Sequence, residues 1–174
     1  MKLSKVFLAL LLSGSASVAL AQPQPPTDCD EQPAAAFEII NNTNTNLSIP
    51  TGGSAISVNQ VNNVTVSNNN GALPANGGSV TVKYCWNPAN NDSTASITVP
   101  AYLSDGSKFG SFKASAPITC IFGNCSLSGS VSYSDAAPAG YRVDLYVYNN
   151  SNGNSASFTI RPKPSSGTAI NSAF

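Results

Sequence analysis

Short runs in which apolar and polar residues alternate recur along the chain from Phe37 to Arg161, separated by clusters of Asn, Gly, Pro and Ser. A period of two is the side-chain period of a β-strand, because successive side chains point to opposite faces. No window carries an apolar stripe at helical spacing. We therefore predict an all-β fold, an immunoglobulin-like antiparallel β-sandwich of roughly 7–10 short strands. Candidate strands lie near 36–40, 46–49, 55–60, 63–67, 79–86, 94–99, 101–103, 108–114, 126–134, 141–149 and 155–161.

The first residues are typical of a secretory signal peptide. Lys2 and Lys5 precede the apolar run 6–12, and Ala19-Leu20-Ala21 has the small-x-small form of a cleavage site. The run is too short for a bilayer, which needs about 20 residues. We expect cleavage after Ala21 and a protein that is secreted or periplasmic, without membrane insertion. Gln22 would be the first mature residue, so a lipid-anchoring cysteine is not expected there.

Proline content divides the rest of the chain. Residues 22–35 contain four prolines and predict an extended leader, since proline removes a backbone donor from any strand. Residues 36–162 predict a single β-sandwich domain, and residues 163–174 a loose C-terminal tail. Removing residues 1–21 leaves 153 of the 174 residues, which is the size of one ordinary domain.

The cysteines are Cys29, Cys85, Cys120 and Cys125. An even number of cysteines in an exported chain indicates disulfides, and four cysteines allow three pairings. We favour Cys120–Cys125 as a small loop staple, and Cys29–Cys85 as a tie between the leader and the domain. A zinc site is disfavoured because the chain has neither a CxxC motif nor a histidine.

The charge of the chain is low, with eight acidic and eight basic residues. Loss of Lys2 and Lys5 with the signal peptide would leave six bases against eight acids, a net charge of −2. Nucleic-acid binding needs a basic stripe, and adsorption to anionic membranes needs a basic cluster. Neither partner is expected.

Catalytic machinery is sparse. The lack of histidine removes the commonest general base and metal ligand. Asp92, Asp105 and Asp135 fall in predicted turns, and no Gly-x-Ser-x-Gly elbow or phosphate-binding glycine loop is found. We expect no enzymatic activity, no cofactor and no metal site.

Asn152-Gly153 predicts a β-hairpin with a two-residue type I′ turn. Pairing of Ser151 with Asn154 would set Val147 opposite Phe158 and Leu145 opposite Ile160, so apolar residues would meet on one face. The same register sets Asp144 opposite Arg161 on the other face, as an opposite-charge pair.

Serine occupies every even position from 126 to 134, whereas Leu127, Val131 and Tyr133 occupy odd ones. We expect this strand to form a hairpin with 141–148, with Val131 opposite Leu145 and Tyr133 opposite Val143.

This arrangement makes the outer face of 141–148 the candidate binding site. Tyr146 would lie between Ser130 and Thr159, and Tyr148 between Ser128 and Ser157. Two exposed rings on a floor of hydroxyls would form a stacking platform for a sugar or a flat protein surface. The competing interpretation is that the leader covers the rings, or that they serve only as good sheet formers. Tyr84 and Trp86 are a second aromatic pair. They lie at even positions, as Val80 and Val82 do, so all four share one face of the strand and we expect the two rings to pack in the core.

The leading functional hypothesis is a secreted, non-enzymatic binding module that recognises a glycan or protein at a cell surface. The first alternative is a structural subunit of an extracellular fibre or matrix, in which open sheet edges pair between chains. The second alternative is a secreted toxin or hydrolase with an unrecognised site. Oligomeric state is not fixed by any of these patterns.

Overall fold

The computed structural model describes residue 29 and residues 34–51, 55–67, 70–87, 94–121, 124–127, 129–150 and 153–164, with the backbone alone for 118–121, 124–127, 149–150 and 153–154. The predicted signal peptide, most of the leader and the tail from residue 165 lie outside these residues. Within them the chain forms twelve β-strands and no helix. The all-β prediction is confirmed.

A five-stranded sheet forms one layer, in the order β11-β12-β1-β6-β4. Its strands are β11 (Tyr141–Asn150), β12 (Gly153–Pro162), β1 (Ala34–Asn41), β6 (Gly78–Trp86) and β4 (Val61–Val66). Strand β1 runs parallel to β12 and antiparallel to β6, so the first and last strands are neighbours at the centre of the sheet. This parallel pair departs from the purely antiparallel sandwich expected from the sequence.

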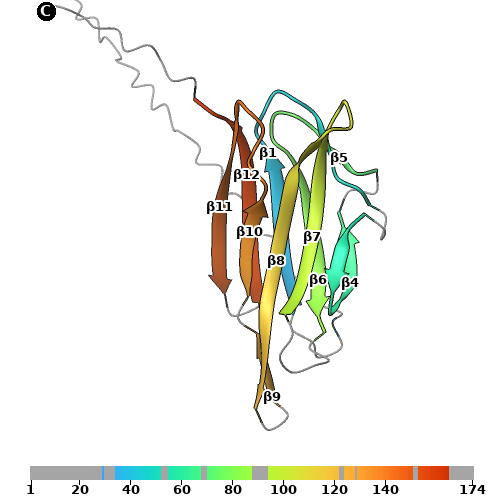
Figure 1. Cartoon of the computed structure of the whole chain (residues 1–174), viewed down its shortest axis with the longest axis vertical. Helices are drawn as coiled ribbons and strands as arrows, with labels where there is room; N and C mark the ends of the chain where they lie inside the picture. The colour runs from blue at the N-terminus through green and yellow to red at the C-terminus, as the bar shows by residue number, and fades with distance from the viewer. Residues whose placement is uncertain are drawn as a thin grey trace, which may run out of the picture.

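A seven-stranded sheet forms the other layer (Figure 1). Its strands are β10 (Ser130–Ser134), β8 (Lys108–Ile121), β7 (Thr94–Leu103), β2 (Leu47–Ser48), β5 (Ala72–Leu73), β3 (Ser57–Asn59) and β9 (Asn124–Leu127). Figure 1 shows the far end of β8, with β9, extending below the rest of the sandwich.

Alternate residues of both sheets meet in one core. The largest fully buried side chains are aromatic and aliphatic, as the period-two pattern predicts: Phe37, Phe109, Phe112, Phe158, Ile39, Ile49, Leu73, Ile97, Ile160, Val80, Val82 and Val99. Phe158 links the layers, since its ring centroid lies 5.7 Å from that of Phe37 and 5.1 Å from that of Phe112. Burial of each such ring stabilises the fold by about 1.5–3 kcal/mol.

Pro100 lies inside β7, which is one continuous strand and not the two strands expected on either side of it. β2 pairs with β7 at Tyr102 and Leu103, and β3 pairs at Ser96 to Thr98. The proline therefore falls between two short partners, where its missing N–H costs no ladder hydrogen bond. The register of β7 against β8 also shifts after Ala101, so an irregularity in the pairing lies beside the proline.

The β11–β12 hairpin exists, but its predicted register is wrong by two residues. Asn150 pairs with Gly153, which sets Leu145 opposite Phe158 and Val147 opposite Ala156. The shift is even, so the apolar residues of both strands still share a face. Asp144 is opposite Thr159, yet its Oδ2 lies 3.3 Å from Nε of Arg161 on the diagonal.

The predicted hairpin between 126–134 and 141–148 is wrong, because β10 pairs with β8 in the other sheet. β9 and β10 continue one register along β8, from Ile121 opposite Asn124 to Ser111 opposite Ser134. Only two residues connect β8 to β9, and so short a connection makes sequential strands pair. Residues 135–140 form a longer loop, which is long enough to carry the chain across to the other sheet.

Tyr133 fixes β10 in place on β8. Its hydroxyl donates a hydrogen bond of 2.9 Å to the carbonyl of Phe109, and its ring lies where any side chain at Gly110 would stand. The glycine therefore admits an aromatic ring that would otherwise collide with β8.

The Cys29–Cys85 disulfide is present and ties residue 29 to β6. Such a bond is consistent with an oxidising extracellular or periplasmic location. The backbone places Cys120 and Cys125 directly opposite each other on β8 and β9, but their side chains lie outside the described part of the chain, and so does the predicted bond between them.

Candidate functional site

The predicted platform residues are not brought together as expected. Tyr146 is 45% exposed and lies opposite Ser157, while Tyr148 is half-buried and lies opposite Ser155. Ser130 belongs to the other sheet, where its hydroxyl lies 3.2 Å from that of Ser115. Thr159 is opposite Asp144, two positions along from Tyr146's own partner. Ser128, the fifth residue of the prediction, lies outside the described residues.

Two of the hydroxyls expected to form an open floor, those of Ser157 and Thr159, are buried, and so is the neighbouring Ser155. Ser155, Ser157 and Thr159 expose 3%, 1% and 0% of their surfaces. Among the described residues, Oγ of Ser157 and Oγ1 of Thr159 have no hydrogen-bond partner. A ligand placed on Tyr146 and Tyr148 would not reach these oxygens, and the polar side chains that share this face of β11, Arg142 and Asp144, already form an ion pair with each other.

The conspicuous feature is strand β11 itself. It lies at the end of the five-stranded sheet and, within the described residues, pairs with β12 alone. Four large hydrophobic residues are exposed in the described part of the chain, and three are consecutive here: Leu145 (42%), Tyr146 (45%) and Val147 (57%). Both faces of this half of the strand are therefore open.

Position in the sheet explains the exposure of Leu145 and Val147. Their partners Phe158 and Ala156 are buried in the core, so the two side chains point toward the other sheet. The strand expected to lie beside β11 as its hairpin partner, β10, instead pairs with β8. Val143, nearer the start of β11, is half-buried against the core, so the opening is confined to the second half of the strand.

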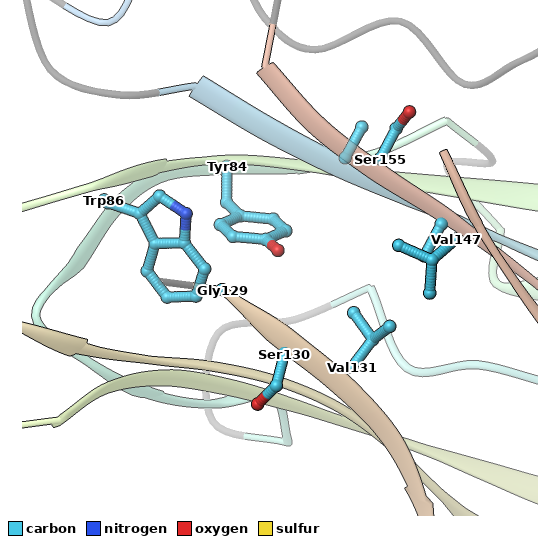
Figure 2. A pocket seen from close by; sticks show the side chains of 9 residues that line it. Tyr84, Trp86, Gly129, Ser130, Val131, Val147 and Ser155 are labelled. Atoms are coloured by element: carbon cyan, nitrogen blue, oxygen red, sulfur yellow. The ribbon is translucent and has the colours of Figure 1, made fainter. Parts of the chain in front are cut away.

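A cavity of about 240 Å³ lies beside this opening (Figure 2). Its lining residues come from β1, β6, β10, β11, β12 and the approach to β10: Ala36, Tyr84, Trp86, Gly129, Ser130, Val131, Val147, Ser155 and Ala156. Figure 2 shows Tyr84 and Trp86 side by side at one end, with Val147 and Val131 facing them. The lining is mainly apolar, and alanine and glycine leave the space that larger side chains would fill.

The aromatic end of the cavity is formed by two buried rings in contact. The rings of Tyr84 and Trp86 meet edge to face, with centroids 4.9 Å apart. Both residues are almost wholly buried, as their assignment to the core predicted. Burial raises the pKa of Tyr84 far above its usual value, so its hydroxyl remains neutral and can donate a hydrogen bond at any physiological pH.

The cavity is not predicted by any local sequence pattern, because it forms where five strands meet. A signal was present, however. Ala34-Ala35-Ala36 precedes the bulky part of β1, and Gly129 precedes Val131, so small residues gather opposite two large aromatic ones.

The described aspartates serve local structure. Asp144 lies 3.3 Å from Arg161 and 3.6 Å from Arg142, and Asp135 lies 2.9 Å from Lys108. Hydrogen bonds from the side chain and then the backbone of Ser107 lower the pKa of the exposed Asp105 below its ordinary value. In the described ranges no three His, Cys, Asp or Glu residues cluster as metal ligands.

The sequence matches no protein-family model and no curated protein. None of the described segments is a helix long and apolar enough to cross a membrane.

Proposed function

We propose that this protein is a secreted, non-enzymatic interaction module that binds an extended polypeptide segment along the free edge of β11. The observation that carries the proposal is the row Leu145-Tyr146-Val147, exposed on a ten-residue edge strand beside an apolar cavity. Open, regular edges bind partner chains by strand addition, and natural sheets usually block them when they have no partner.

Strand addition would use both the open edge of β11 and the cavity beside it. Backbone groups of the incoming segment would pair with the outward N–H and C=O groups of β11. Its alternate side chains would point toward the other sheet and pack on Leu145 and Val147. One side chain could enter between Val147 and Val131 and reach the cavity edge formed by Tyr84 and Trp86.

A polypeptide fits this site better than a glycan does. Small-molecule sites usually enclose about 300–1,000 Å³ and orient the ligand through several polar groups. The cavity is smaller, at about 240 Å³, and mainly apolar. The hydroxyls of β12 that could have contacted a sugar are buried.

The scaffold we propose is an immunoglobulin-like sandwich exported with the help of the residue 1–21 signal peptide. The Cys29–Cys85 bond supports export. The opposed backbone positions of Cys120 and Cys125 support a second bond, because directly paired antiparallel residues have the Cα separation that a disulfide needs.

Screening the purified protein in parallel against a display library of random peptides, about as long as β11, and against a glycan array tests the proposal. We expect uncharged peptides with alternating apolar residues to be enriched. Val147→Asp should weaken their binding about tenfold or more, because binding would bury an unpaired carboxylate.

Val58→Asp is the matched control, since Val58 is similarly exposed (48%) but lies on β3 in the other sheet. It should leave peptide binding unchanged. Glycan binding without peptide binding, or equal loss in both variants, would refute the proposal.

A further inference from the structure

If the proposed function holds, the regularity of β11 defines which kind of polypeptide can bind along its edge. β11 pairs with β12 through ten consecutive residue pairs, from Tyr141 to Asn150, without a register shift. Its free side is therefore regular over the same length. A partner must be extended, mainly uncharged, and apolar at alternate positions.

The sequence of β11 meets these requirements itself. Antiparallel pairing of two copies about Tyr146 sets Tyr146 opposite its own counterpart and Leu145 opposite Val147 on both sides of the centre. The three exposed hydrophobic residues of each copy are then all covered. This pairing is isologous, as in a two-fold symmetric dimer.

Charge is compatible with the same register. Arg142 would lie opposite Asn150, and Asp144 opposite Tyr148, so no like charges meet. Centring the pair two residues earlier would set Asp144 opposite Asp144, which is unfavourable. Centring it two residues later would pair only residues 146–150 and leave Leu145 uncovered. Centring it on Leu145 would set Tyr146 opposite Asp144, and centring it on Val147 would set Leu145 opposite Asn149. Only the register centred on Tyr146 pairs the three exposed hydrophobic residues with one another.

Parity excludes the registers that are centred between two residues. They would turn the inward face of one copy outward in the other, because neighbouring residues of a strand point to opposite faces. Leu145 and Val147 of one copy would then face solvent. Only a residue-centred register keeps both apolar faces on the side of the cavity.

We propose that a second copy of this chain occupies the β11 edge, with the two strands antiparallel about Tyr146. The two five-stranded sheets then form one continuous sheet, and the apolar side chains of each β11 cover the opening beside the other's Val147.

Cysteine cross-linking of the full chain tests the register. Paired Cα atoms in an antiparallel sheet lie about 4.5–5.5 Å apart, within the range of a disulfide. Tyr146→Cys should therefore give a disulfide-linked dimer under mild oxidation, and mass spectrometry should locate the link between the substituted positions of the two copies. Arg142→Cys is the matched control on the same strand, because its two copies would be separated by about 27 Å.

Sedimentation of the unmodified protein is an independent measurement that needs no variant, and it should show a reversible monomer–dimer equilibrium. The inference is overturned if the protein stays monomeric at all concentrations, or if Arg142→Cys cross-links as well as Tyr146→Cys. A monomer whose β11 still binds library peptides would refute the self-pairing and leave the proposed function standing.

Discussion

The two edges of the five-stranded sheet are built in opposite ways. β4, at one edge, has six residues, and its register against β6 shifts between Asn62 and Thr65. Asn63 within it adopts a left-handed backbone conformation, with φ of 51°. β11, at the other edge, has ten residues in unbroken register with its neighbour.

The exposed side chains of the two edge strands differ as well. The exposed residues of β4 are polar: Asn62, Asn63 and Thr65. Those of β11 include three large hydrophobic side chains. A short, bulged, polar strand blocks the addition of another strand, whereas a long, regular, apolar one permits it. Among the described residues, one sheet thus has a protected edge and an open edge, and this contrast supports the site that we propose on β11.

The largest expected effect on stability distinguishes β12 from β11, its neighbour in the same sheet. Phe158→Ala should lower the free energy of unfolding by about 3–5 kcal/mol, because Phe158 is fully buried between the layers. Leu145→Ala, directly opposite on β11, should cost less than about 1 kcal/mol, since that side chain is 42% exposed. Denaturant unfolding measures both. Equal costs would mean that the apolar residues of β11 serve stability and not binding.

A second, smaller effect concerns the bulge that protects β4. Asn63→Ala should be less stable than Asn63→Gly by about 1 kcal/mol, because a Cβ disfavours the left-handed conformation and glycine does not. Both variants lose the asparagine side chain, so the difference in their unfolding free energies isolates the backbone. If the two unfold alike, the bulge does not depend on this conformation.

The smallest effect on stability is expected from a charge placed on each edge. Leu145→Lys and Thr65→Lys should each change the free energy of unfolding by less than about 0.5 kcal/mol, since both positions are exposed. Light scattering should nevertheless show weaker self-association for Leu145→Lys alone. Weakening in both variants would show that the edges are equivalent.

Local sequence predicted the elements of this fold well. Alternation located most strands, and even the misplaced β11–β12 register kept the correct face, because an even shift preserves parity. The error arose at the Asn152-Gly153 signal, since the observed pairing joins Asn150 to Gly153 directly.

Strand neighbours could not be predicted in the same way. Which sheet β10 joins was decided by the contact of Tyr133 with Gly110 and by the two-residue connection before β9. The predicted platform depended on a hairpin between 126–134 and 141–148. Its residues are not brought together because Ser130 lies on β10 in the other sheet. Tyr146 is still on the exposed face, but the cavity beside it depends on five strands at once, which no local pattern encodes.

The parallel pairing of β1 with β12 has a kinetic consequence. Phe37 and Ile39 pair with Ala156 and Phe158, which lie near the other end of the domain sequence. Their contacts are incomplete until β12 has folded beside β1. Contacts of such large sequence separation slow folding, because a long loop must close before they form. The domain must therefore fold late and as a whole, and until β12 docks, the apolar strand at its centre remains available to the wrong partner.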